Sequence, residues 1–356
     1  MKDVKRQHTV PRTYLKGFTA DEKFLYFFDK VSRKAKRVTV RHIAVSDNFY
    51  DISPDTISTD GIDFEFDFKF VEKFLANIES EYSLYAKPIK CLRIGEKINA
   101  EQKGDMSLFM AVQLLRTFEM RAFIWNSQTA MTQQICSDLV RLNYPEEYQD
   151  LMPTVAYDEK FISTLHAKAL TDPDRIEKFA SILYGHIWQI GVTDNKHILY
   201  SSDSPVVRYT ALPRVSLRPE PLSQTSEKLV SQMTVQNRYP GIGENGVEIA
   251  FPISSNRVIL LRDRAYFALQ GVEDGLVTSI GREKVDFLNR LQVEQSFRQV
   301  FCEKQEFALA SQYCQNNPEC CDPKRFSALV NTSISASEES LLSTLRPSQP
   351  TEKSGG

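Results

Sequence analysis

The stretch MSLFMAVQLLRTFEMRAFIW, residues 106–125, decides much of the fold. It lies within residues 100–143, a segment without proline, and it is apolar on most sides rather than along one stripe. A helix that is apolar all round is typical of a buried position in a core. The segment therefore predicts one very long helix, or two helices in series, at the centre of the protein.

Further helices are predicted on both sides of this segment. From Val71 to Tyr85, apolar and aromatic side chains recur at i, i+3, i+4, i+7, i+11 and i+14, which places them on one helical face. Pro88 is expected just past the end of this helix. After the long segment, the pattern predicts helices over 159–169 and 175–190.

Strands are predicted before and after the helices. Residues 24–29 and 36–40 indicate a hairpin, and residues 48–51 a third short strand. Later in the chain the pattern predicts strands over 197–201, 247–253 and 257–262, and a helix over 282–301. This order predicts an α+β fold with an N-terminal β-hairpin region, central long helices, a second β region after residue 195 and a closing helix.

The chain has 356 residues, enough for one large domain or two small ones. We expect a single α+β domain over 1–310, a short C-terminal extension over 311–332 and a disordered tail over 333–356, which is rich in Ser, Glu and Pro. The Pro-rich residues 211–246 predict a long irregular excursion. Its G-x-G-x-x-G pattern, residues 241–246, is interpreted as a turn, because a strand follows it where a nucleotide site needs a helix.

The charge of the chain is unevenly placed. The net charge of −2 predicts no global attraction to nucleic acid or membrane. Residues 1–42, however, contain twelve Lys or Arg and four acids, and residues 51–101 contain eleven acids and six bases. The two segments could pack together and neutralise each other. Alternatively, the first could present a basic face to nucleic acid or another phosphate-bearing partner.

The sequence favours a cytoplasmic location without a membrane partner. No apolar run approaches the roughly 18 residues of a spanning helix, and the N-terminus has no apolar signal region. The six cysteines are few for the length, which fits reduced thiols. Cys314, Cys320 and Cys321 could hold zinc, but no His lies nearby and the spacing is not C-x-x-C. Ordinary thiols are therefore the preferred interpretation.

Residues 63–70 alternate strictly between charged residues and Phe. In a strand, Asp63, Glu65 and Asp67 would form a row of carboxylates on one face. The row could bind a divalent metal, although a solvated strand face is the commoner meaning of such a pattern.

The most distinctive stretch is QHTVPRTYLKGF, residues 7–18. His8 precedes every clear element and is followed by Val10-Pro11. Such a His could be a general base or a metal ligand, or it could fasten the terminus by hydrogen bonds.

With this opening, H-x-V-P-x-x-Y-L-x-x-F, the chain resembles the mainly bacterial domain-of-unknown-function family numbered 4238. The resemblance spans about residues 7–303. It is supported by the helix with Glu72 and Glu79, Gln113 to Thr117, Trp188, Ser202 to Val206, Phe251 to Ser254, Asn289 and Gln295. Thr9 and Ser204 depart from the family, which more often has an aromatic residue and Asn there. The resemblance implies the fold and an intracellular location and leaves the reaction open.

Five of the matching residues are polar and stand among apolar neighbours: His8, Glu79, Gln113, Arg116 and Asp203. Gln113 and Arg116 are three apart and share one face of the predicted buried helix. A buried Arg needs a carboxylate or a bound anion, and Glu79 or Asp203 could supply the carboxylate. The set could be a structural network, or a polar pocket in which Arg116 holds a phosphate.

Two classes of function follow. In the first, the protein is a nuclease-like or other phosphate-directed hydrolase of bacterial or mobile-element origin, with a divalent metal as a candidate cofactor. Its catalytic candidates are His8, Glu79, Arg116 and Asp203, and its substrate-binding candidates are Gln113, Arg12 and Tyr14. In the second, the same residues are structural and the protein is a non-catalytic binding or regulatory module. The first class is slightly favoured.

Overall fold

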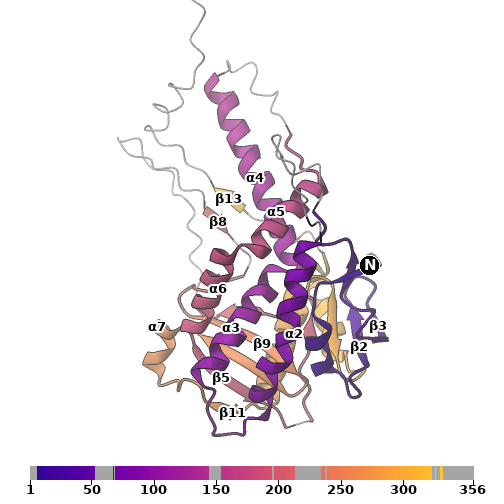
Figure 1. Cartoon of the computed structure of the whole chain (residues 1–356), viewed down its shortest axis with the longest axis vertical. Coiled ribbons are helices and arrows are strands. Elements are labelled where there is room, and N and C mark those ends of the chain that lie inside the picture. The colour runs from indigo at the N-terminus through magenta and orange to yellow at the C-terminus, as the bar shows by residue number, and fades with distance from the viewer. Residues whose placement is uncertain are drawn as a thin grey trace, which may run out of the picture. The chain divides into compact units, whose positions relative to one another are not determined.

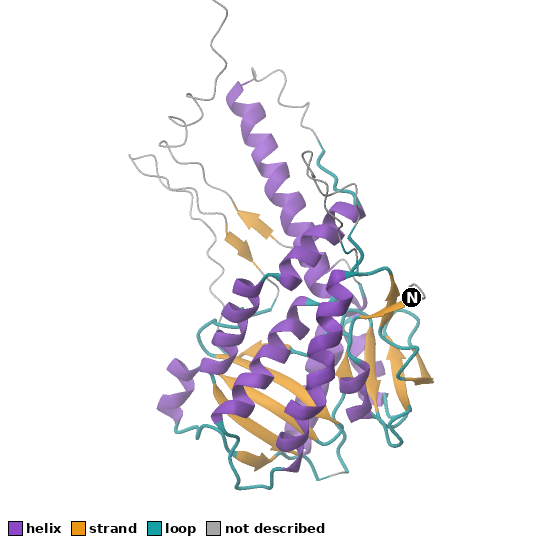
Figure 2. Cartoon of the chain, in the orientation of Figure 1, coloured by secondary structure: helices purple, strands orange, loops and turns teal. Residues whose placement is uncertain are grey.

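A computed structural model describes most of the chain and has the predicted α+β composition (Figure 2). The described residues are 6–52, 67, 69–143, 154–194, 196–212, 234–236, 239–322, 325 and 329–331. The chain divides into two compact units. The larger comprises Met1–Asn126, Ala156–Leu212 and Asn237–Ser327, and the smaller Ser127–Val155, Pro213–Gln236 and Ala328–Gly356. The predicted tail and the acidic residues Asp63 and Glu65 lie outside the described residues.

Four helices pack on one another in the larger unit: α2 (Phe70–Cys91), α3 (Ala100–Leu115), α5 (Glu159–Thr171) and α6 (Pro173–Gly185). The start of α3 is set by a capping box. Asn99 accepts a hydrogen bond from the Gln102 N–H, and the Gln102 side chain accepts one from the Asn99 N–H.

Two predicted helix ends are wrong. Pro88 lies inside α2, which continues to Cys91. The helix predicted over 175–190 ends at Gly185, because Ile187–Val192 forms strand β5 in the middle of a sheet. At β5, pairing with neighbouring strands overrides the local helical signal.

The long segment 100–143 forms two helices, the second of the two arrangements predicted. Arg116 is the C-terminal cap of α3, and α4 (Phe118–Asn143) begins after Thr117. The Thr117 hydroxyl accepts a hydrogen bond from the Met120 N–H and thereby caps α4. The break places the side chain of Arg116 at a helix end.

A five-stranded sheet forms the centre of the larger unit (Figure 1). Its order is β11 (Val277–Ser279), β5, β10 (Arg257–Arg262), β9 (Val247–Ser254) and β7 (Val207–Thr210). All pairs are antiparallel except β11 with β5. The β9–β10 hairpin confirms the predicted one, and the turns of residues 241–246 lead into β9 as interpreted.

The two faces of this sheet belong to different cores. Ile259 and Leu261 pack in the main core with α2, α3 and α6, and Figure 1 shows α2 and α3 crossing in front of the sheet. Val258 and Leu260 pack instead with α8 (Arg282–Gln295). The alternation follows from the two-residue period of a strand.

A four-stranded sheet contains the predicted N-terminal hairpin. Its order is β3 (Lys34–Thr39), β2 (Phe24–Asp29), β12 (Gln299–Cys302) and β6 (Ser201–Ser202). Two predictions are corrected here. The closing helix ends at Gln295 and is followed by β12, which pairs with β2 and β6. Of the strand predicted over 197–201, only its last residue lies in β6.

Short elements complete the larger unit. Strand β1 (Arg6–His8) pairs with β4 (Val45–Asp47), so the third strand lies three residues before its predicted place, and Asn48 turns the chain with a φ of 51°. The remaining short helices are α1 (Arg12–Leu15), η1 (Lys16–Phe18), α7 (Arg264–Phe267), η4 (Ala268–Gln270), α9 (Ala308–Asn316) and η5 (Pro318–Cys321).

In the smaller unit, β8 (Thr234–Gln236) pairs with β13 (Leu329–Asn331). Of all the helices described in either unit, none combines the length and the apolar character that crossing a bilayer requires.

Candidate functional site

A cavity of about 550 Å³ lies in the larger unit between β1, the turn after β3, and α2. Its lining is polar and includes four arginines. The residues that matter below are Arg6, His8, Arg12, Arg41, Glu79 and Arg116. We call this site the arginine cavity. Four of the residues singled out from the sequence, His8, Arg12, Glu79 and Arg116, therefore lie together.

Arg116 is buried and forms the floor of the cavity. Its Nη2 donates one hydrogen bond to the His8 carbonyl over 2.6 Å and another to Glu79 Oε1 over 2.8 Å. The Tyr50 hydroxyl donates to the Arg116 carbonyl over 2.8 Å. Of the two carboxylates offered by the sequence, Glu79 is thus the partner. Because the guanidinium is 2% exposed, this pairing is what makes its burial tolerable.

His8 lies on β1 and lines the wall of the cavity. Its Nε2 is sealed from solvent and has no hydrogen-bond partner among the described residues. Burial lowers the pKa of His8 to about 4, opposed by the charge of Glu79 and reinforced by that of Arg12. The imidazole is therefore neutral at pH 7, and its Nε2 is not engaged by any of the described residues.

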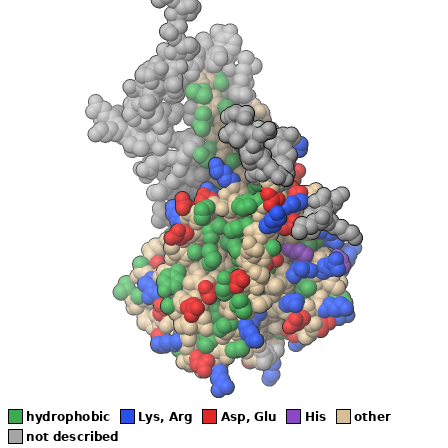
Figure 3. All heavy atoms as spheres, in the orientation of Figure 1, with side chains coloured by type: hydrophobic (Ala, Val, Ile, Leu, Met, Phe, Trp, Pro, Cys, Tyr) green, Lys and Arg blue, Asp and Glu red, His purple; other side chains and the backbone are tan. Residues whose placement is uncertain are grey.

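The rim of the cavity carries uncompensated positive charge. Arg6, Arg12 and Arg41 are exposed, and none forms a hydrogen bond or ion pair with another residue in the part of the chain that the structure describes. Figure 3 shows Lys and Arg side chains gathered on the side where β2 and β3 lie. The basic excess of residues 1–42 is thus not fully neutralised by contacts within the described chain.

Two glutamates of α2 reach the same cavity. Glu72 and Glu79 are seven residues apart and share one helical face. Burial raises the pKa of Glu72, while Glu79 is held by Arg116. Sequence reasoning included Glu79 and missed Glu72 as a site residue, although the seven-residue spacing was a signal for it.

A hydrogen-bonded support holds β1 in place beside the cavity. The Gln7 side chain accepts from the Tyr50 N–H over 2.6 Å and donates to Asp51 over 2.6 Å. Lys69 in turn pairs with Asp51 at 2.8 Å. Gln7 and Tyr50 were not predicted, because their roles depend on contacts more than forty residues apart.

Asp203 does not belong to this cavity. It is buried after β6, and its carboxylate accepts hydrogen bonds from the N–H groups of Phe297, Arg298 and Gln299 over 2.7, 2.8 and 2.7 Å. We call this arrangement the Asp203 corner. The sequence-based grouping of Asp203 with His8 and Arg116 is therefore corrected: Asp203 fastens the turn between α8 and β12.

Gln113 and Tyr14 also do not line the cavity. Gln113 is buried and donates to the Thr9 carbonyl over 3.4 Å. The Tyr14 hydroxyl lies 2.7 Å from the Ser201 hydroxyl and donates to the Pro252 carbonyl over 2.7 Å. Of the three substrate-binding candidates, only Arg12 faces the cavity. Gln113 and Tyr14 join distant segments in the core.

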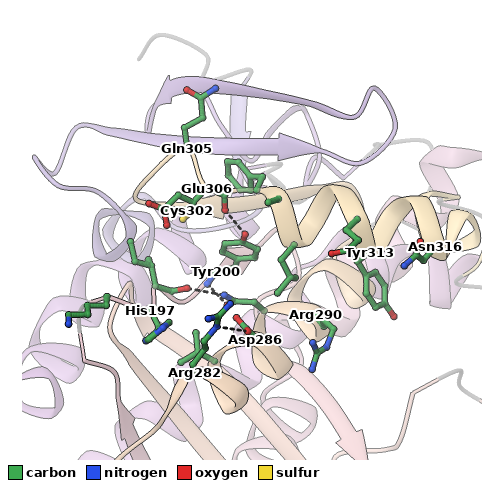
Figure 4. Close-up of a pocket in the computed structure, with 18 residues that line it drawn as sticks. His197, Tyr200, Arg282, Asp286, Arg290, Cys302, Gln305, Glu306, Tyr313 and Asn316 are labelled. Atoms are coloured by element: carbon green, nitrogen blue, oxygen red, sulfur yellow. Dashed lines mark hydrogen bonds and ion pairs between the residues drawn. The ribbon is translucent and has the colours of Figure 1, made fainter.

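A second, larger cavity of about 880 Å³ was missed by sequence reasoning (Figure 4). Several of its polar groups are paired within the chain. Arg282 pairs with Asp286 at 3.5 Å, and the Tyr200 hydroxyl donates to the Glu306 carbonyl. Its walls come from four separate segments, so no local pattern announces it. We favour the arginine cavity because three of its four arginines, Arg6, Arg12 and Arg41, have no hydrogen-bond or ion-pair partner among the described residues.

The described residues contain one group of three His, Cys, Asp or Glu side chains that can reach a single ion, and it consists of cysteines. At the arginine cavity, His8 and Glu79 would be candidate ligands. A metal there would need further oxygen ligands from water or a bound phosphate, as magnesium commonly has.

The family comparison agrees with the opening motif. A family model described as "Protein of unknown function (DUF4238)" matches residues 6–306. No curated protein and no solved structure matches the chain significantly. Since the match covers most of the chain and all residues of the arginine cavity, this protein belongs to the DUF4238 family.

Proposed function

We propose that the arginine cavity binds a phosphate-bearing ligand and that the protein is a phosphate-directed, nuclease-like hydrolase. The observation that carries the proposal is the set of three guanidinium groups, those of Arg6, Arg12 and Arg41, that line the cavity with the buried Arg116 and have no partner among the described residues. Guanidinium groups donate paired hydrogen bonds that match the oxygens of a phosphate, and they stay charged at any physiological pH.

The neighbouring groups suit hydrolysis. His8 is neutral at pH 7, so its free Nε2 can take a proton from an attacking water after a small rearrangement opens it to the cavity. Arg12 and Arg41 would stabilise the negative charge that develops on the phosphoryl oxygens. Arg116, fixed by Glu79, would hold the phosphate in place.

Nucleic acid is the substrate class that best fits the surroundings. The cavity lies in the segment with the largest basic excess, twelve Lys or Arg against four acids in residues 1–42. A long polyanion would contact this surface beyond the cavity itself. A mononucleotide or a free phosphate would use only the cavity.

A non-catalytic binding or regulatory module is the alternative. One observation favours it: the Nε and Nη2 donors of Arg116 are already engaged by the His8 carbonyl, Glu79 and Tyr50. In that case Arg116 would be structural, and only the rim arginines would contact a ligand.

Binding and turnover separate these functions. Calorimetric titration of the wild type with inorganic phosphate, a mononucleotide and a single-stranded oligonucleotide should detect binding. Arg12→Ala and Arg41→Ala should each weaken it about tenfold, the effect of one lost charged hydrogen bond. Lys36→Ala is the matched control, because Lys36 is an exposed cation of β3 outside the cavity. It should change the affinity for inorganic phosphate and for the mononucleotide less than about twofold.

Turnover is then measured on labelled DNA and RNA with Mg²⁺, with Mn²⁺ and with a chelator. His8→Gln should retain binding and lose cleavage by about a hundredfold, the usual contribution of a general base. Binding without cleavage of any substrate would favour the module. Absence of binding to all three ligands would contradict the proposal.

A further inference from the structure

Three cysteine side chains meet near the C-terminal end of the larger unit. Cys314 lies on α9, and Cys320 and Cys321 lie on η5. The Sγ of Cys320 is 3.8 Å from that of Cys314 and 3.9 Å from that of Cys321. All three sulfurs lie within 4.8 Å of one another. A spacing that is not C-x-x-C thus still brings three thiols to one point.

Two of these separations match the edges of a metal–thiolate tetrahedron, and the third pair of sulfurs lies within 4.8 Å. Zinc–sulfur bonds are about 2.3 Å long, so two thiolates on one tetrahedral zinc ion are about 3.8 Å apart. A disulfide would require the sulfurs to approach to about 2 Å, and all three cysteines are free. The observed arrangement is therefore close to that of a metal site and far from that of a disulfide.

Two of the three thiols, those of Cys314 and Cys320, are buried, and positive charge lies nearby. Cys314 and Cys320 are buried in a small core with Phe307 and Ala310. Lys30 is fully buried, and its Nζ donates to the carbonyls of Val293 and Ser296. The positive charges of Lys30 and Arg325 interact electrostatically with the Cys320 thiol. A cation here offsets the net negative charge that three thiolates and one divalent ion would have.

We propose that Cys314, Cys320 and Cys321 bind one zinc ion through three thiolates. Cysteine sulfur is the ligand that zinc and other soft ions prefer. Cys321 is only half buried, which leaves a side from which the ion enters and on which water or a solute completes the tetrahedron. The ion would join the end of α9 to η5, outside the residues 6–306 that the family model matches.

Cobalt substitution tests this site directly. Tag-free, full-length protein is reduced, stripped of metal and titrated with Co²⁺, which absorbs in the visible when it is held tetrahedrally by thiolates. We expect one equivalent to bind with thiolate charge-transfer bands, and one equivalent of Zn²⁺ to displace it. Elemental analysis after dialysis should then find one zinc per chain.

Cysteine variants identify the ligands. Cys321→Ser, which changes the least buried thiol of the three, should weaken cobalt binding by about tenfold or more, since even loss of a ligand's hydrogen-bond partner has that effect. Cys320→Ser should do the same. Cys91→Ser is the matched control, because Cys91 is exposed and lies on α2. It should leave the titration unchanged, and circular dichroism should show that all variants fold.

Three results would overturn the proposal. The first is wild-type protein that shows no thiolate–cobalt absorption. The second is a titration that Cys320→Ser and Cys321→Ser, both folded, leave unaltered. The third is reduced protein that binds no metal and that forms a Cys314–Cys320 disulfide on exposure to air, which mass spectrometry would detect; the thiols would then be a redox pair.

Discussion

The arginine cavity and the Asp203 corner both contain charged side chains. They differ in whether those side chains find hydrogen-bond partners within the protein. At the Asp203 corner, three backbone N–H groups of one turn point at one carboxylate. At the arginine cavity, Arg6, Arg12 and Arg41 find no such partner among the described residues, and neither does the Nε2 of His8.

This difference separates structure from candidate function. A buried charge whose hydrogen bonds all come from its own chain stabilises the fold. A set of charges left without partners at a cavity invites a ligand of opposite charge. Asp203 and Arg12 were both candidate site residues in the sequence. Their hydrogen-bond partners in the structure distinguish them.

The largest effect is expected at the Asp203 corner. Asp203→Ala would remove a buried carboxylate and leave three N–H groups without their acceptor, so the free energy of unfolding should fall by about 3–5 kcal/mol. Urea denaturation followed by circular dichroism measures it, with Asp174→Ala, an exposed position on α6, as control. Phosphate affinity of the folded variant should be unchanged. A loss of stability below about 1 kcal/mol would contradict the structural role that distinguishes the Asp203 corner from the arginine cavity.

The next largest effect is expected at Arg116, which belongs to both kinds of site. Arg116→Met keeps most of the volume but leaves Glu79 and the His8 carbonyl without their donor. Unfolding free energy should fall by about 2–4 kcal/mol, because Glu79 is partly hydrated. A double-mutant cycle with Glu79→Gln should show coupling of roughly 1 kcal/mol. Additive losses would mean that the ion pair contributes little.

A smaller effect is expected from the pH dependence of His8. Its pKa is about 4 in the folded protein and near the ordinary value of 6.5 when unfolded. Between these values the unfolded chain binds more protons, so this contribution is present above pH 6.5 and is lost as the pH falls towards 4. Allowing for partial hydration of the ring, it should amount to about 2 kcal/mol.

His8→Gln isolates the pH-dependent contribution of His8 to stability, since the other buried histidines, His166 and His186, titrate in both proteins. Urea denaturation of wild type and variant is measured from pH 4 to pH 7, and the wild type should lose about 2 kcal/mol more stability than the variant as the pH falls. Parallel curves would show that His8 ionises in the folded protein as it does in the unfolded one.

The smallest effect on stability is expected at the rim. Arg12→Ala and Arg41→Ala remove exposed side chains that have no partner among the described residues, so each should change the free energy of unfolding by less than about 0.5 kcal/mol. The same variants should lose affinity for phosphate. A stability loss above about 1 kcal/mol in either would indicate a structural role and would bring the rim closer to the Asp203 corner.

Local patterns predicted those elements whose signal and environment agree. The β2–β3 and β9–β10 hairpins alternate between faces that are packed differently, and α3 begins where Asn99 and Gln102 cap it. The pattern failed where a short strand follows a helix. Residues 187–190 and 299–301, which belong to strands β5 and β12, were assigned to helices, because a buried strand and a buried helix end are equally apolar.

By itself the sequence determined the α+β class and the membership of the DUF4238 family, and it included His8, Arg12, Glu79 and Arg116 among its candidate site residues. Those residues have strong local signals: a motif, a helical period and a buried charge that requires a partner. Only the tertiary structure decided that Asp203, Gln113 and Tyr14 lie elsewhere, and that three cysteines meet. Their partners are distant in the chain, and no local rule of spacing specifies a contact that is made only when separate elements pack.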